Sequence, residues 1–94
     1  MQVLISAEAQ SEFRHAVKFY EKRQKGLGKK FSNAVKSKSN FLQSNPEAAE
    51  IKYLQIRVTT VKGFPFTIHY THSDKKILVV AIFHNSRHPD QLIR

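Results

Sequence analysis

The sequence contains no cysteine and only three glycines and three prolines among its 94 residues. Without cysteine, neither a disulfide framework nor a thiolate zinc site can stabilise so small a protein. The low glycine and proline content, together with 40% hydrophobic residues, excludes a disordered or low-complexity tail. We therefore expect a folded chain whose stability depends on one modest hydrophobic core.

Long apolar runs are also missing. Nowhere do 18 apolar residues follow one another, as a membrane-spanning helix requires. The first six residues, MQVLIS, have no basic region ahead of their short apolar run, which a secretory signal would have. We expect neither secretion nor membrane insertion, and therefore a cytoplasmic protein with a single domain spanning residues 1–94.

Acidic residues are scarce, with 7 Asp and Glu against 16 Lys and Arg and a formal net charge of +9. Such a field attracts a polyanion or an acidic protein partner, and composition does not choose between them. Basic residues gather in the first half of the chain, at Arg14, Lys18, Lys22, Arg23, Lys25, Lys29, Lys30, Lys36 and Lys38. This run is typical of a solvated helical face and is also compatible with contacts to nucleic acid.

Hydrophobic periodicity predicts a short strand over residues 2–6 and then two helices. Apolar residues recur every three or four positions between Ala9 and Tyr20, and again between Phe31 and Leu42. Glycines within residues 26–28 separate the two stretches, and Pro46 ends the second one because proline disfavours helix in the residue before it. The two helices should pack as an antiparallel hairpin.

After Pro46 the period changes to two, which is typical of half-buried strands. Leu54, Ile56 and Val58 lie on one side of a first strand; a second alternates over residues 64–71, and a third spans residues 76–84. The third is apolar on both faces, which favours a central position. We expect an α+β fold of order β-α-α-β-β-β, with the N-terminal helical hairpin packed on one face of a small antiparallel sheet. The other face should be partly open, as a shallow groove lined by polar side chains.

Most enzyme classes find no support in the residues. Four histidines lie in the second half, but no carboxylate has a helpful spacing for a metal site, and both a serine elbow and a glycine-rich phosphate loop are missing. We therefore expect no metal ion and no cofactor. Metal-free cleavage of a phosphodiester needs only a base, an acid and cations. The side chains that could supply these are Arg57, Lys62, Tyr70, His84 and Arg87.

Each of these candidates also has a simpler role. Arg57 could make a surface ion pair, and Tyr70 could belong to the core because it alternates in phase with Phe66 and Ile68. His84 could make a structural hydrogen bond at the end of its strand. Arg87 is a bidentate donor that suits a phosphate, and it could equally be a solvated arginine.

The order of motifs resembles the RelE/ParE toxin superfamily of type II toxin-antitoxin systems, which includes plasmid stabilisation toxins. The similarity extends through almost the whole chain. It rests on Phe19-Tyr20-Glu21, Gly26-Leu27-Gly28-Lys29-Lys30-Phe31, Asn45-Pro46-Glu47, Ile56-Arg57, Gly63-Phe64-Pro65-Phe66-Thr67-Ile68-His69-Tyr70 and Val80-Ala81-Ile82-Phe83-His84-Asn85-Ser86-Arg87-His88-Pro89.

The resemblance implies a growth-inhibiting toxin that is neutralised by a small, acidic antitoxin protein encoded in a neighbouring reading frame. ParE-like members poison DNA gyrase, whereas RelE-like members cleave messenger RNA on the ribosome without a metal ion. The resemblance therefore leaves open whether the chain is an enzyme, and if it is, a metal-independent endoribonuclease is expected.

The C-terminal residues favour the ParE-like branch. No aromatic residue follows Phe83, although RelE-like enzymes often carry one near the C-terminus. The ParE-like ending appears as Arg87-His88-Pro89, with Leu92 where that branch has tryptophan and Arg94 beyond. As site residues we predict, for catalysis, Arg57, His84 and Arg87, and for binding of the target or of nucleic acid, Lys62, Tyr70, His88 and Arg94. The remaining alternatives are a noncatalytic RNA-binding module and a family member that has lost toxicity.

Overall fold

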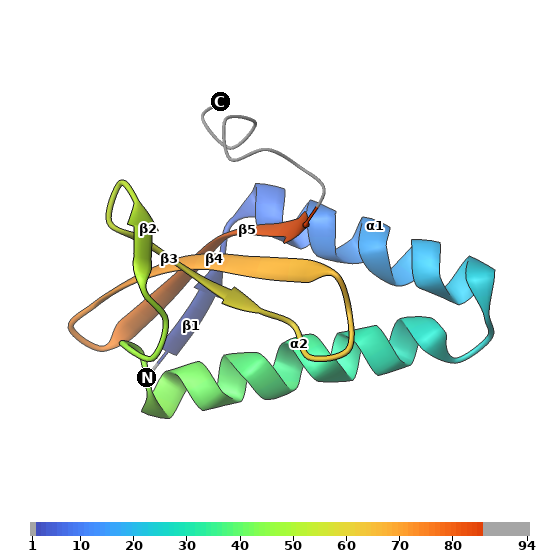
Figure 1. Cartoon of the computed structure of the whole chain (residues 1–94), viewed down its shortest axis with the longest axis horizontal. Coiled ribbons are helices and arrows are strands. Elements are labelled where there is room, and N and C mark those ends of the chain that lie inside the picture. The colour runs from blue at the N-terminus through green and yellow to red at the C-terminus, as the bar shows by residue number, and fades with distance from the viewer. Residues whose placement is uncertain (1, 86–94) are drawn as a thin grey trace.

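The fold combines a helical hairpin with a five-stranded sheet, seen in a computed structural model that describes residues 2–85. The elements are β1 (Gln2–Ile5), α1 (Ala7–Arg23), α2 (Leu27–Ser44), β2 (Ile51–Tyr53), β3 (Ile56–Thr60), β4 (Phe66–Ser73) and β5 (Lys76–His84). The strand order is β1-β5-β4-β3-β2, with β1 parallel to β5 and the other pairs antiparallel. The predicted α+β class and the order of the predicted elements are confirmed, and β5 lies inside the sheet between β1 and β4 (Figure 1). Two features differ from the prediction, because β2 is an additional strand and β1 runs parallel to β5 in a sheet expected to be antiparallel.

Ser6 makes the turn from β1 into α1. Its Oγ accepts a hydrogen bond from the backbone N–H of Ala9 at 3.1 Å, which satisfies one of the unpaired donors of the first helical turn. The same hydroxyl donates to the carbonyl of Val80 at 3.2 Å. One side chain therefore both starts α1 and holds that start against β5.

Aromatic rings fill the space between the hairpin and the sheet. Phe31 of α2 lies 5.3 Å from the ring of Tyr20 on α1 and 5.0 Å from that of Phe66 on β4, measured between centroids. Ile68, Tyr70 and the other inward residues of β4 and β5 complete this core. The apolar stripes of both helices therefore face the sheet, as their spacing predicts.

Two details of the sequence interpretation were wrong. Leu54, Ile56 and Val58 were expected to lie on one continuous strand. Leu54 and Gln55 instead form the turn between β2 and β3, with φ of 42° and 64°. No glycine or asparagine marks this turn, so no local pattern predicts it. The apolar stretch from Phe31 to Leu42 also places Phe41 on the inner side of the second helix, but Phe41 is about half exposed.

A bulge in β5 shifts the alternation of side chains along this strand. His69 pairs with Ala81 and Tyr70 pairs with Val79, so Val80 is an extra residue in β5. The bulge keeps Ile82 in the core below the helices. It leaves Ala81, with Phe83 further along, on the same face as His69, away from the hairpin.

Candidate functional site

The sheet face opposite the helices carries a cavity of about 420 Å³. Its lining residues come from the β2–β3 hairpin, the middle strands and the end of β5: Lys52, Tyr53, Val58, Thr67, His69, Phe83, His84 and Asn85. The predicted open groove is thus present, but Val58 and Phe83 make it more apolar than expected. Among these lining residues, Lys52 is the one that is a lysine or arginine.

His69 forms the floor of the cavity and is held by hydrogen bonds at both ring nitrogens. The Tyr53 hydroxyl lies 2.9 Å from Nδ1, and the Thr67 hydroxyl lies 2.8 Å from Nε2. Thr67 also donates to the carbonyl of Phe83 at 3.4 Å. A consistent direction of protons follows, in which Nε2–H donates to Thr67 while Nδ1 accepts from Tyr53.

Burial keeps His69 neutral. Only 6% of the residue is exposed, and desolvation lowers the pKa of His69 from 6.5 to about 4. With both ring nitrogens engaged and no charge at neutral pH, the imidazole contributes no cation to the cavity. The cavity therefore suits an apolar or neutral polar group better than a phosphate.

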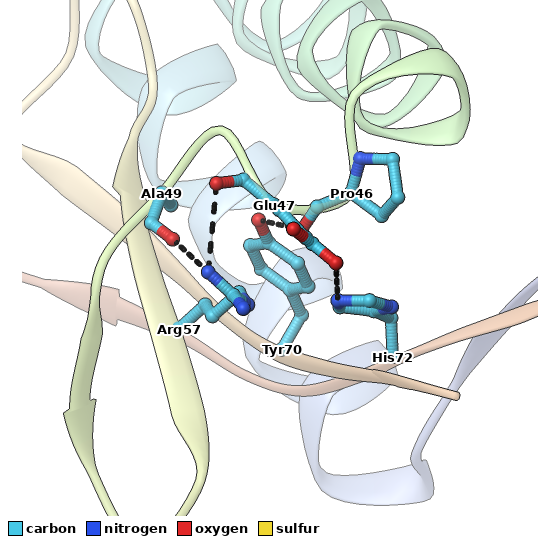
Figure 2. Close-up of polar contacts among 6 residues, drawn as sticks. All are labelled: Pro46, Glu47, Ala49, Arg57, Tyr70 and His72. Atoms are coloured by element: carbon cyan, nitrogen blue, oxygen red, sulfur yellow. Dashed lines mark hydrogen bonds and ion pairs between the residues drawn. The ribbon is translucent and has the colours of Figure 1, made fainter. Parts of the chain in front are cut away.

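Arg57 lies on the other face of the sheet, where it anchors the loop between α2 and β2 (Figure 2). Its guanidinium donates to the carbonyl of Ala49 at 2.7 Å and more weakly to that of Glu47 at 3.5 Å. Both bonds use Nη1, so backbone carbonyls occupy one of the nitrogens that a catalytic arginine would offer to a phosphate. In this position Arg57 stabilises a loop.

Tyr70 pairs with Arg57 across β3 and β4 and serves the same loop. Its hydroxyl donates to the carbonyl of Pro46 at 2.9 Å, and the residue is fully buried. Its alternative assignment to the core is confirmed. The contact with a target predicted for Tyr70 would require the core to open.

His84 ends β5 beside the middle turns of α1. It lines a second cavity of about 350 Å³, together with Ser11, Glu12, His15, Ala16, Phe19, Phe66 and Ile82. His84 pairs with Phe66 and Arg57 pairs with Tyr70 along β4, four residues apart. At about 3.3 Å per residue, His84 and Arg57 are separated by about 13 Å along β4. They also belong to different neighbours of β4, since His84 lies in β5 and Arg57 in β3.

The predicted site residues are therefore dispersed over the structure as far as residues 2–85 show. Lys62 is exposed in the turn before β4. The remaining predicted residues, Arg87, His88 and Arg94, lie outside the described residues, and their roles stay predictions. Within residues 2–85, no three His, Asp or Glu side chains are grouped as metal ligands would be.

Sequence reasoning missed the pair Tyr53 and His69. A signal was present, because His69 lies out of phase with Phe66, Ile68 and Tyr70 and so had to face away from the core. The position of Tyr53 opposite this face depends on the β2–β3 hairpin, which was not predicted.

Comparisons with known proteins agree with this architecture. The family model described as "ParE toxin of type II toxin-antitoxin system, parDE" matches residues 3–89. A solved structure titled "Chromosomal ParDE TA system from P. aeruginosa" superposes with a TM-score of 0.77 and 17% identity, covering 89% of this chain and 95% of that one. A comparison with proteins of curated function found no match. In addition, neither described helix has the length and apolarity needed to cross a membrane. Because the family model covers nearly the whole length, the chain belongs to the ParE toxin family of type II toxin-antitoxin systems.

Proposed function

We propose that this ParE-type toxin stops growth by poisoning DNA gyrase in the cytoplasm, rather than by cutting messenger RNA. Membership of the family implies a protein antitoxin as the partner. The target rests on one observation, the lack of a ribonuclease constellation among residues 2–85. Arg57 is engaged by loop carbonyls, and His69 is neutral and enclosed.

Cleavage of RNA would need a base and an acid near the scissile phosphate, with cations to stabilise the charge that develops there. Among residues 2–85, the lining of the open-face cavity includes one lysine or arginine, which is Lys52. The alternative, ribosome-dependent cleavage of messenger RNA, therefore has little support from the side chains of residues 2–85. Binding to a protein target such as gyrase requires no such base, acid and cations.

The test uses the purified full chain with gyrase and a supercoiled plasmid. Poisoning predicts broken plasmid DNA that appears only when gyrase and the toxin are both present. In parallel, translating ribosomes with a reporter messenger RNA should leave the message intact. Cut messages together with unbroken plasmid would reject the proposal in favour of the ribonuclease.

We further propose that the antitoxin covers the open face of the sheet. Leu4 and Leu78 are paired there across β1 and β5, and both remain about 40% exposed. Together with the cavity, they offer the apolar area that a partly disordered segment must bury to offset the entropy of folding. The net charge of +9 suits an acidic segment, whose approach it would accelerate.

Leu78→Asp tests this placement through two separate measurements. Growth arrest on induction of the toxin alone should persist, while co-expression of the antitoxin should no longer restore growth. Asn40→Asp adds the same charge to the exposed side of α2 and should still be neutralised. Full neutralisation of the Leu78 variant would place the antitoxin elsewhere.

A further inference from the structure

The helical hairpin carries a row of cations on its outer side, away from the sheet. Lys18 lies two residues from both Ala16 and Tyr20, which puts it about 200° around α1 from these core residues. Arg14 and Lys22 are four residues to either side and extend the same stripe over about 12 Å. We use the name outer basic surface for Arg14, Lys18, Lys22, Lys29 and Lys36, all of which are exposed.

No carboxylate neutralises these cations among the described residues. The two ion pairs found within residues 2–85 join Lys52 to Glu50 and His72 to Glu47, all of them outside the hairpin. Glu21 precedes Lys22 in α1, but its carboxylate accepts hydrogen bonds from two backbone N–H groups at the start of α2. The outer basic surface therefore keeps its full positive charge.

The surface has the wrong composition for a protein that folds on binding. Beside its cations on α2 lie small polar residues, the exposed Asn33, Ser37 and Asn40. A segment that orders on contact needs apolar area to bury, which this surface lacks. A polyanion needs none, because the release of its condensed counterions drives binding.

Duplex DNA fits the surface better than a single strand does. Proteins recognise single strands largely by stacking bases on exposed aromatic rings. The two large exposed rings of the hairpin already carry cations, since Arg23 lies 5.3 Å from the centroid of Phe19 and Lys38 lies 5.4 Å from that of Phe41. A duplex offers one charge per about 1.7 Å of its axis, so a row of about 12 Å meets several phosphates.

We propose that the outer basic surface binds the phosphate backbone of duplex DNA without sequence preference. This inference goes beyond the proposed function and holds whichever target the toxin attacks. It places the DNA contact on the side of the hairpin opposite the sheet, away from the apolar face proposed for the antitoxin. Both contacts can then exist at once.

The experiment measures the affinity of the full chain for a short duplex DNA of arbitrary sequence at several salt concentrations. With five phosphates contacted, the slope of log K against log salt should be about −4.5, equivalent to about a 500-fold loss between 50 and 200 mM. Lys18→Gln with Lys22→Gln should reduce the slope to about −2.7 and that loss to about 40-fold. The charge-preserving pair Lys18→Arg with Lys22→Arg should retain the original slope.

The matched control removes the same charge elsewhere, with Lys75→Gln and Lys76→Gln in the turn before and at the start of β5. It should leave the slope near −4.5, and an equal decrease would show that net charge alone, and not this surface, determines binding. Circular dichroism of each variant checks that the helices persist. Tighter binding of single-stranded RNA, or of polyglutamate of equal charge, would also overturn the proposal.

Discussion

The carboxylate of Glu21 on α1 accepts a hydrogen bond from the backbone N–H of Gly28 at 3.0 Å, while its two oxygens also accept from the N–H of Gly26. Gly26, the residue before α2, provides no side chain to cap that helix. Glu21 therefore caps α2 from the neighbouring helix, and its negative charge lies where the helix dipole is positive. This contact links the Phe19-Tyr20-Glu21 motif to the glycines of the hairpin turn.

Glu21→Ala should lower the free energy of unfolding by about 1 to 2 kcal/mol, because two backbone donors lose their acceptor. Glu21→Gln keeps one carbonyl acceptor and should cost less. Urea denaturation measures both. Glu50→Gln is the control, since it removes a carboxylate whose exposed ion pair with Lys52 contributes under about 1 kcal/mol. Equal stability of the Ala variant and the control would contradict the capping role.

Gly28→Ala should destabilise the hairpin although alanine favours helix. A Cβ at this position would lie 2.7 Å from the carbonyl oxygen of Val17, a backbone atom that can move only if α1 and α2 separate. Overpacking of this kind costs about 1 to 3 kcal/mol, which exceeds the gain of up to about 1 kcal/mol from helix propensity. Ser37→Ala, exposed on the same helix, should be neutral or slightly stabilising in thermal denaturation. A more stable Gly28 variant would mean that the helices are not in close contact here.

These two residues show how far the sequence could predict the hairpin. The 3.6-residue period and Gly26 were enough to give two helices and a turn between them. The need for glycine at position 28 depends on the distance between two packed helices, which no local pattern encodes. Glu21 likewise gave no local signal, because its partners lie five and seven residues ahead, across the turn.

Arg57 and Tyr70 should act together on the loop at residues 45–50. Tyr70→Phe removes the donor to Pro46, and Arg57→Met removes the donor to Ala49; each should cost about 1 to 3 kcal/mol of stability. Because both side chains hold one loop, the double variant should lose less than the sum of the two. Hydrogen exchange of the loop amides should accelerate in each variant.

Measuring the toxicity of these variants distinguishes a loop-anchoring role of Arg57 from a catalytic one. If Arg57 only anchors the loop, growth arrest by Arg57→Met should decline no more than its loss of folded protein accounts for. Tyr70→Phe, adjusted to equal stability, should show the same decline. Complete loss of toxicity in a well-folded Arg57 variant alone would return Arg57 to the active site.

His69 should make folding sensitive to acid. Because burial lowers its pKa from 6.5 to about 4, the unfolded chain binds a proton more readily than the folded chain between these values. The stability contribution is thus complete above about pH 6.5 and is lost as the pH falls toward 4. The decrease between pH 7.5 and pH 5 should be about 2 kcal/mol.

Urea denaturation at several pH values measures this effect. His69→Gln should flatten the profile in that window, whereas His15→Gln, an exposed substitution on α1, should leave it unchanged. Identical pH profiles for the original chain and the His69 variant would show that the imidazole is not held neutral.

The open-face cavity was only half predictable. Alternation along β4 puts His69 and Thr67 on the face away from the core, and this much follows from the sequence. The presence of Phe83 rather than Ile82 on that face depends on the bulge at Val80, and the position of Tyr53 depends on the β2–β3 hairpin. Each is a pairing between distant segments, so neither leaves a local pattern.

The turn between β2 and β3 offers a stabilising substitution. Leu54 and Gln55 both have positive φ, of 42° and 64°, in a two-residue turn that usually contains Asn-Gly because glycine adopts this backbone without strain. Gln55→Gly should therefore raise the free energy of unfolding by up to about 1 kcal/mol. Gln55→Ala retains a Cβ and should bring no gain, and Gln24→Gly, where the backbone has φ of −159°, should not stabilise either. The melting temperatures of the three variants decide the matter, since a destabilised Gln55→Gly chain would mean that the side chain, rather than the backbone angle, determines the turn.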